Sequence, residues 1–323
     1  MKIFSICSLC LLLFSCSSTS NQVVSQNYVH KYGFALSPKE WVERDQDGKI
    51  VSLLENGVSV SQSFENGTLH GPTTYSYPES EIIEQLWLYD QGDLLKITQF
   101  DKNGIPIREE FFELDNRKTI SLWDEKGAPM SIEEYEEDKL LQGSYFTPEN
   151  ELESIVENGH GIRTKRNREG LLLLKDQIEE GELLSRTSFH PNAEVQTITF
   201  YDHFLPHGEM MEYTPYGELH QITHWKSGTL EGMKILYRNG KKIREIPYVD
   251  GKKEGIERSF DSDGTILSEV EYKNDEKHGQ SIVYEGKSSK TEWFYHGTAV
   301  NEKKFVALES SDALLEELER HFE

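Results

Sequence analysis

The chain is poor in cysteine, and the few it has are confined to one end. Of its 323 residues only 3 are cysteines, and Cys7, Cys10 and Cys16 all lie near the N-terminus. The remainder of the chain can therefore form no disulfide, and it has neither a thiol nucleophile nor a cysteine-based metal site. An exported protein built from it must be stabilised by packing alone.

Basic residues are also scarce. The chain has 34 Lys and Arg against 57 Asp and Glu, a formal net charge of −23. This excess repels the phosphates of nucleic acids and of anionic lipids, so we expect neither as a partner. The charge is uneven, because residues 131–157 carry nine acidic residues and one lysine, net −8, whereas residues 226–253 carry eight basic and three acidic residues, net +5.

Both charged stretches are most simply explained as solvated sheet surface and as turn lysines that discourage edge pairing. The sharper hypothesis is that the acidic stretch docks a basic partner. Its candidate docking patch consists of Glu133, Glu134, Glu136, Glu137 and Asp138.

Catalytic signatures are missing as well. The sequence contains no His-Glu-x-x-His, no Gly-x-Ser-x-Gly, no phosphate loop and no dinucleotide fingerprint. Four histidines precede a glycine at one repeat phase, where other copies have Glu231 and Glu254: they are His70, His160, His207 and His278. Because they lie whole repeats apart, we expect turn residues and not metal ligands. The sequence thus predicts no enzyme, no catalytic residue, no metal and no cofactor.

What the sequence does contain is an internal repeat. Segments that begin at Gly208, Gly232, Gly255 and Gly279 are variations on one pattern, 23 or 24 residues apart. A unit of this length buries its apolar face only by stacking on its neighbours. Two series of turn residues, offset by half a period, predict two strands per unit. Their glycines are Gly67, Gly92, Gly104, Gly127, Gly217, Gly228, Gly240, Gly251, Gly264, Gly286 and Gly297.

Between the turns, apolar and polar residues alternate, as in residues 242–248 and 267–272, which predicts half-buried strands. An aromatic residue recurs three positions before the second series of turns. We expect these rings to stack in columns and to supply most of the cohesion between hairpins. They are Phe64, Tyr89, Tyr135, Trp225, Tyr248 and Tyr272. The predicted fold is all-β, an elongated, twisted antiparallel sheet of stacked β-hairpin repeats of ~23 residues.

The pattern Tyr-x-Asn-Gly-Lys at 237–241, followed by Gly-Lys-x-x-Gly at 251–255, resembles the variant MORN repeat (membrane occupation and recognition nexus) of many bacterial proteins. The resemblance is good over residues 200–297 and looser over 51–191. It implies a long sheet of successive hairpins that binds or scaffolds and has no activity of its own; some bacterial members carry an antitoxin label. Residues 171–174 and 204–206 interrupt the pattern, so irregular or bulged copies are expected there.

The N-terminus has the features of a secretory signal, with Lys2 ahead of an apolar run at residues 3–14. That run of about 12 residues is shorter than the ~20 of a membrane span. Its end, Leu-Phe-Ser-Cys at 13–16, resembles a bacterial lipobox, which implies that Cys16 becomes residue one and carries a diacylglyceryl, palmitate-type lipid. We expect export and anchoring to the cell membrane, or to the outer membrane of a cell with two, because Ser17 and not Asp follows.

These features divide the chain into a signal peptide at 1–15, lipidated Cys16 with a polar tether at 16–36, a repeat array at 37–306 and an amphipathic helix at 307–323. The helix is predicted from a Ser310 cap and from apolar Ala313, Leu314, Leu318 and Phe322. Because sheet edges must be covered, we expect it to cap the last repeat. The alternative is a helix offered to a partner.

Three classes of function follow. The leading one is a lipid-anchored protein of the bacterial envelope, facing the periplasm or the surface, that binds or scaffolds another protein or an envelope polymer. The second is an antitoxin-like or immunity protein that neutralises a toxin by direct binding. The third, an enzyme acting on an envelope polymer, requires a cleft that a single-layer array does not readily form.

Overall fold

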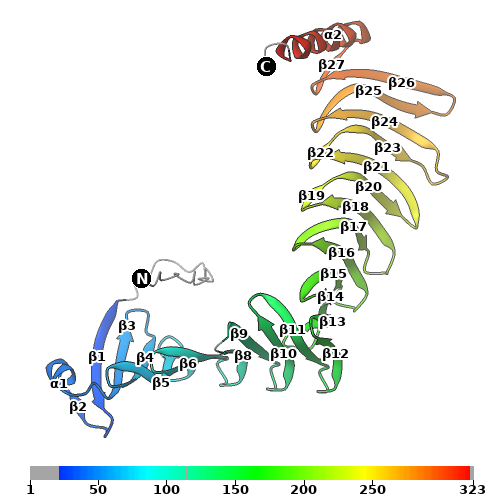
Figure 1. Cartoon of the computed structure of the whole chain (residues 1–323). Helices are drawn as coiled ribbons and strands as arrows, with labels where there is room; N and C mark the ends of the chain where they lie inside the picture. Colours follow the sequence, from blue (N-terminus) through cyan, green and yellow to red (C-terminus); the bar gives the residue numbers. More distant parts are fainter. Residues whose placement is uncertain (1–21, 114, 321–323) are drawn as a thin grey trace. The chain divides into compact units, whose positions relative to one another are not determined.

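The computed structural model describes residues 22–113 and 115–320. Within them, 27 strands form one antiparallel sheet that does not close on itself, and a C-terminal helix follows. The predicted all-β fold of stacked hairpins with a terminal helix is therefore confirmed. The chain divides into two compact units, Met1–Leu122 and Trp123–Glu323, whose elements are labelled in Figure 1.

The first unit is a series of hairpins preceded by a short helix. Its elements are β1 (Val23–His30), β2 (Ala35–Leu36), α1 (Pro38–Glu43), β3 (Gly48–Leu54), β4 (Ser59–Glu65), β5 (Thr68–Ser76), β6 (Ile83–Asp90), β7 (Asp93–Phe100), β8 (Pro106–Phe112) and β9 (Arg117–Trp123). Strand β1 pairs with both β2 and β3. The tether predicted for residues 16–36 is thus wrong over Val23–His30, because these residues pair with β3. The signal peptide and Cys16 lie outside the described residues.

Helix α1 covers the first hairpins. Its start is fixed by a capping box, in which the backbone N–H of Glu40 donates to Ser37 Oγ and the backbone N–H of Ser37 donates to the Glu40 carboxylate, with Pro38 in the first turn. The buried ring of Trp41 lies 5.6 Å from that of Tyr28 and 5.9 Å from that of Phe64. The helix therefore supplies the apolar cover that the first strands lack.

The second unit continues the hairpins and ends in a longer helix. Its elements are β10 (Pro129–Glu136), β11 (Lys139–Phe146), β12 (Leu152–Glu157), β13 (His160–Arg166), β14 (Leu172–Glu179), β15 (Glu182–Phe189), β16 (Val195–Asp202), β17 (Leu205–Tyr213), β18 (Leu219–Lys226), β19 (Thr229–Leu230), β20 (Gly232–Arg238), β21 (Lys241–Val249), β22 (Lys252–Lys253), β23 (Gly255–Phe260), β24 (Ile266–Lys273), β25 (Glu276–Glu285), β26 (Ser288–Tyr295), β27 (Thr298–Val300) and α2 (Glu302–Glu319). Register shifts occur in many pairings, including the β13–β14 pairing at Leu172 and Leu174 and the β16–β17 pairing at Pro206. Because regular copies have them too, they are not peculiar to residues 171–174 and 204–206.

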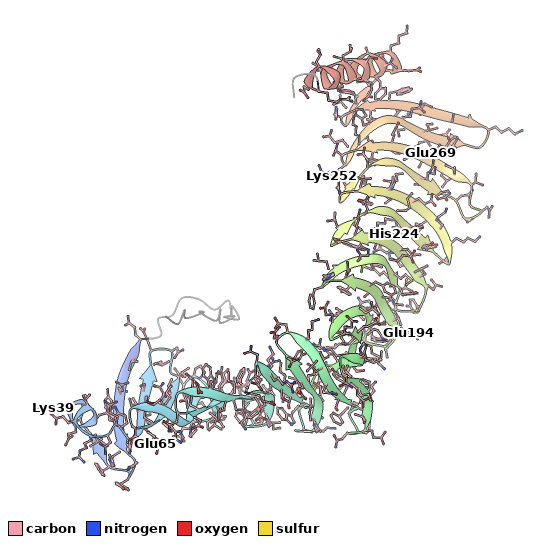
Figure 2. All side chains as sticks on the ribbon, viewed as in Figure 1. Lys39, Glu65, Glu194, His224, Lys252 and Glu269 are labelled. Carbon is pink, nitrogen blue, oxygen red and sulfur yellow. The ribbon has the colours of Figure 1, made fainter. Side chains whose placement is uncertain are left out.

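The second unit has only a small apolar core. Figure 2 draws the side chains along its strands, with His224 of β18 and Glu269 of β24 among those labelled. Its buried apolar cluster consists of Leu140, Tyr145, Val156 and Ile178. Much of the remaining cohesion must come from backbone pairing and from contacts between neighbouring strands on one face.

Helix α2 caps the last strands, but not with the predicted residues. It begins at Glu302, and its cap is Asn301, whose side chain accepts the backbone N–H of Lys304 at 2.9 Å; Ser310 lies inside the helix. Leu314 and Leu318, predicted to face the sheet, are 61% and 57% exposed. Residue 322 lies outside the described part of the chain.

Phe305, Glu309 and Asp312 of α2 contact the sheet. The Phe305 ring lies 5.1 Å from that of Trp293, Glu309 pairs with buried His278, and Asp312 accepts a hydrogen bond from the Tyr295 hydroxyl. The contact is mixed because the end of the sheet presents the polar tips of His278 and Tyr295 as well as rings. An apolar count therefore predicts the wrong helix face.

Candidate binding surfaces on the sheet

The strands end in turns, which form a row along each of the two sides of the sheet where the strands end. All of the glycines predicted to form turns, from Gly67 to Gly297, have positive φ. Several are preceded by a residue that also has positive φ, as in Asn66-Gly67, Asn239-Gly240 and Asp250-Gly251. Two successive positive φ values are typical of the tight turns whose twist matches that of the flanking strands.

A side chain from one repeat binds the turn of the next repeat in at least five places. In each case a backbone N–H of a positive-φ turn residue donates to a His Nδ1 or Glu carboxylate located 18 to 21 positions earlier. The pairs are Gln91 with His70, Ser227 with His207, Asp250 with Glu231, Asn274 with Glu254, and His296 with His278, at 3.4, 3.4, 2.9, 2.8 and 3.3 Å. We call these contacts turn ties.

The glycine that follows each acceptor explains the geometry of the turn ties. Gly71, Gly208, Gly232, Gly255 and Gly279 all have positive φ, between 82° and 111°. Such a glycine bends the strand and redirects the preceding side chain, as in a β-bulge. His and Glu occupy equivalent positions in the sequence, but only the structure reveals their common role, which is to accept one hydrogen bond.

The predicted aromatic columns are not rings stacked on rings. Equivalent positions of successive repeats lie two strands, about 9.6 Å, apart, whereas ring pairs prefer centroids 4.5–7 Å apart. The strand between them therefore supplies the contact. Lys253, paired with Tyr248, places Nζ 4.7 Å from the centroid of Tyr272, and Lys277, paired with Tyr272, places Nζ 4.9 Å from the centroid of Phe294.

The other predicted rings have different neighbours. Phe64 meets Trp41 of α1, and the ring of Tyr89 lies 6.5 Å from that of Trp87. Trp225 donates its indole N–H to Thr223 at 3.0 Å, and the Tyr135 hydroxyl donates to Glu133 at 2.7 Å. These rings thus contact α1 or a side chain two positions earlier on their own strand.

The structure buries one residue of the candidate acidic docking patch and leaves the others exposed or partly exposed. Glu133 is only 4% exposed and accepts hydrogen bonds from Tyr135, Tyr145 and Arg163. It is therefore wrong as a docking residue, because alternation along β10 directs it into the buried face. Glu136, Glu137 and Asp138 are exposed, and Glu134 is partly so.

Glu133 belongs to a chain of buried charges across β10 to β15. Arg163 Nε donates to Glu133 at 2.8 Å and its Nη1 lies 3.9 Å from Asp176, which is bound on its other side by Arg186. Burial, and then the negative charge of Glu133, raise the pKa of the Tyr145 hydroxyl. Burial and the positive charge of Arg163 lower the pKa of Lys165. These charges order the interior of the sheet and are not offered to solvent.

Three turns at one edge of the second unit are stacked directly on one another. Backbone N–H groups of Leu140, Gly159 and Gly181 donate to Gly181, Leu141 and Gly159 at 3.1, 2.9 and 2.9 Å. Lys139 also pairs with Glu182 across the stack at 3.2 Å. The turns are consequently close enough for their acidic side chains to act together. We call this row of turns, at residues 136–139, 157–160 and 179–182, the acidic turn edge.

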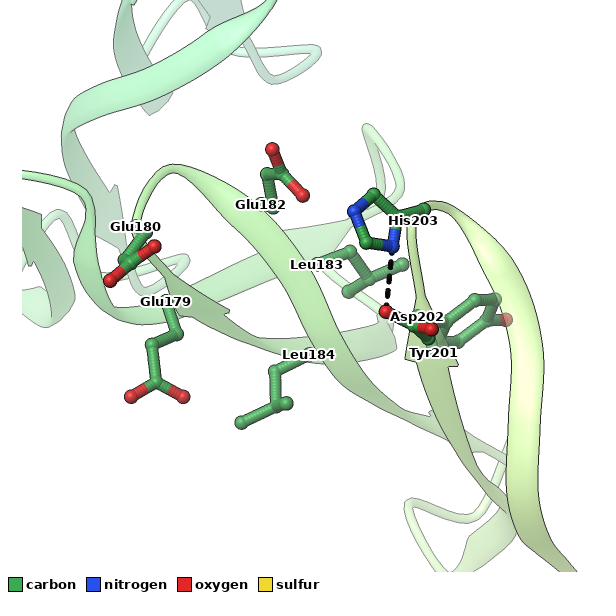
Figure 3. A pocket seen from close by; sticks show the side chains of 8 residues that line it. All are labelled: Glu179, Glu180, Glu182, Leu183, Leu184, Tyr201, Asp202 and His203. Carbon is green, nitrogen blue, oxygen red and sulfur yellow. Dashed lines mark hydrogen bonds and ion pairs between the residues drawn. The ribbon is translucent and has the colours of Figure 1, made fainter. Parts of the chain in front are cut away.

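A hollow of about 340 Å³ opens beside the acidic turn edge, where the β14–β15 and β16–β17 turns meet (Figure 3). Its walls combine carboxylates with apolar side chains, and the His203 ring lies 2.8 Å from the Asp202 carboxylate. The lining residues are Glu179, Glu180, Glu182, Leu183, Leu184, Tyr201, Asp202 and His203. No sequence motif marks this site, because its two halves are some twenty positions apart.

The carboxylates of this hollow do not converge as metal ligands do. Among residues 22–113 and 115–320, no group of three or more His, Cys, Asp or Glu side chains is arranged to hold a metal ion. No helix within the same residues is both long and apolar enough to cross a membrane.

Comparison with known proteins gives one family match. Residues 253–274 match the MORN repeat variant, which agrees with the resemblance of the repeats. No curated protein matches the chain. Among solved structures, "TcdB2-TccC3-Cdc42" is 11% identical with a TM-score of 0.19, over 85% of this chain and 18% of that chain. BamB from Moraxella catarrhalis is 10% identical with a TM-score of 0.14, over 79% of this chain and 81% of that chain. Likenesses this low carry no functional argument.

Proposed function

We propose that the chain is a lipid-anchored, non-enzymatic binding protein of the bacterial envelope that holds another protein or an envelope polymer on its sheet. The observation that carries this proposal is the acidic turn edge with its adjoining hollow. Exposed carboxylates and apolar side chains gather there on a rigid stack of turns. Such a combination suits recognition of another molecule, because apolar contact supplies affinity and charge supplies selectivity.

The sequence supports the location. Lys2, the apolar run and Cys16 have the order of a lipoprotein signal, and an acylated Cys16 would attach the repeats to a membrane. The sequence also contains none of the catalytic motifs sought in it, such as His-Glu-x-x-His or Gly-x-Ser-x-Gly, that would favour an enzyme. A scaffold that displays turns in a fixed row needs no such motif.

The test has two arms. The tagged chain is expressed in its own cell with a clickable palmitate analogue, and the Cys16→Ala variant serves as the control; label and membrane association are expected only for the native sequence. Photo-crosslinking groups placed at Glu180 and at Glu218 then compare the acidic turn edge with the opposite edge. A specific crosslinked partner at Glu180 is expected. Equal, nonspecific crosslinking at both positions would contradict the proposal.

A further inference from the structure

The hollow at the acidic turn edge has carboxylates that form no ion pair with the described residues. They are those of Glu179 and Glu180, and both residues are exposed. Glu182 is paired with Lys139, and Asp202 is paired with His203. The nearby guanidinium of Arg186 is already held by buried Asp176. The local field is therefore negative, and no neighbouring basic residue neutralises Glu179 and Glu180.

Apolar side chains lie within and next to the same hollow. Leu183 and Leu184 line it, and Leu184 is 41% exposed. At the adjoining β16–β17 turn, Phe204 is 62% exposed and Leu205 is 48% exposed. Both Phe204 and the preceding His203 have positive φ, at 65° and 46°. Non-glycine residues adopt this conformation at some energetic cost, and here it presents a large ring to solvent.

We propose that this hollow docks a cationic, amphipathic segment of a partner protein. Its lysine or arginine heads pair with the exposed carboxylates on the two sides of the hollow, those of Glu179 and Glu180 and that of Asp202 (Figure 3), and its apolar side chains pack on Leu184 and Phe204. This assignment rests on the proposed binding function and names the chemistry of one partner. Charge complementarity decides the occupant, because an anionic polymer is repelled and a neutral one leaves the carboxylates unpaired.

Two features of the surface favour a peptide over a metal ion. The first is apolar: a hydrated metal ion gains nothing from Leu184 or Phe204, whereas a side chain of a partner buries them at roughly 25 cal/mol per Å². The second is the rigidity of the row. Stacked turns held by backbone hydrogen bonds lose little conformational entropy when a partner docks.

The experiment uses the full-length chain and fluorescent twelve-residue peptides. One peptide alternates Lys and Leu, a second alternates Lys and Ser, and a third alternates Glu and Leu. Anisotropy at low and at 0.5 M salt measures binding. We expect the Lys-Leu peptide to bind at least tenfold more tightly than the Lys-Ser peptide, and the Glu-Leu peptide not to bind.

A matched pair of variants locates the site. The triple variant Glu179→Gln, Glu180→Gln, Asp202→Asn removes three charges from the hollow, and Glu149→Gln, Glu151→Gln, Glu218→Gln removes three from the opposite edge. We expect at least tenfold weaker binding of the Lys-Leu peptide for the first variant and less than twofold for the second. Leu184→Ser with Phe204→Ser should reduce the preference for Lys-Leu over Lys-Ser.

Some outcomes would overturn the inference. Equal losses for both triple variants would mean that only net charge attracts the peptide. Equal affinity for the Lys-Leu and Lys-Ser peptides would show that apolar packing does not contribute to binding. Binding of the Glu-Leu peptide would show that the carboxylates do not select a cationic partner. If the crosslinked cellular partner is retained by the first triple variant, the inference fails while the proposed binding function stands.

Discussion

Arg186 binds the fully buried carboxylate of Asp176 through two hydrogen bonds. The Asp176 carboxylate is 0% exposed and accepts hydrogen bonds from Arg186 Nε at 2.7 Å and Nη2 at 2.9 Å. This bidentate geometry satisfies both oxygens of a carboxylate that water does not reach. A sheet with so few buried apolar residues thus depends in part on charges that would be costly to leave unpaired.

The first prediction concerns this pair. Arg186→Met leaves Asp176 with only the distant Nη1 of Arg163, at 3.9 Å. Breaking a buried pair typically costs 3–5 kcal/mol, but Arg186 is 34% exposed, so we expect about 2 kcal/mol. Urea unfolding followed by circular dichroism measures it. The double variant Asp176→Leu, Arg186→Met should recover most of the loss, and a loss that persisted there would assign the effect to packing of the arginine stem.

The second prediction concerns the turn ties. His207→Ala removes the acceptor of the Ser227 N–H, and because the contact is exposed we expect a loss of only about 0.5–1 kcal/mol. His207→Glu should retain most of the stability, since Glu231 and Glu254 accept the equivalent N–H groups. Amide exchange at Ser227 reports the tie directly. His220→Ala, at an exposed histidine that forms no turn tie, is the control. If His207→Glu lost as much stability as His207→Ala, His and Glu would not share the role of accepting the turn N–H.

The third prediction concerns glycines with similar φ and different neighbours. A Cβ on Gly159, with φ +77°, would lie 2.6 Å from the Gly181 nitrogen, whereas a Cβ on Gly240, with φ +71°, would meet nothing within 4 Å. Both alanine variants incur the strain of a positive φ, roughly 1 kcal/mol. Gly159→Ala must also displace backbone in the acidic turn edge. We expect a midpoint of thermal unfolding clearly lower for Gly159→Ala, and equal midpoints would show that the turn stack is loose.

The fourth prediction concerns pH and helix α2. The hydrogen bond from the Tyr295 hydroxyl to Asp312 raises the pKa of Tyr295 to about 12. A raised pKa stabilises the protonated form in the folded state, so this contribution is complete below about pH 10, the usual tyrosine value, and is lost as pH rises toward 12. The contact is accessible to solvent, so we predict a direction and not an energy.

The fluorescence of Trp293, whose ring meets Phe305, reports docking of α2. We expect its emission to shift between pH 10 and 12 in the native chain. Tyr295→Phe, which lacks the hydroxyl at this position, should show a smaller change, because the other 14 of the chain's 15 tyrosines titrate in both proteins. An identical step in both proteins would attribute the change to other groups.

The sequence predicted the fold well because its information is local and repeated. Glycine, Asn and Asp at half-period spacing define the turns, and one alternating segment such as residues 267–272 predicts a strand that β24 bears out. The MORN-like pattern added the expectation of successive hairpins. Where each copy repeats its neighbour, an error in one copy is corrected by the next.

The predictions that failed depended on distances between strands. Aromatic residues in equivalent positions are too far apart to touch, and only the pairing register reveals Lys253 beside Tyr272. Glu133 lies in a run of acidic residues that predicts exposure, yet it is buried and forms an ion pair with Arg163, which is thirty positions away. The hollow and the docked face of α2 likewise arise from segments that no local pattern connects.

The turn ties have a consequence for how such a chain can change in length. Loss or duplication of a whole copy leaves every acceptor facing an equivalent amide, so neighbouring hairpins rejoin without a mismatch. The ties themselves span 18 to 21 positions, so a bulge or a turn can absorb a single inserted residue, whereas an insertion that shifts the pairing register turns alternate side chains to the opposite face. Descendants of this chain should therefore differ by complete units, or by single residues placed in bulges and turns.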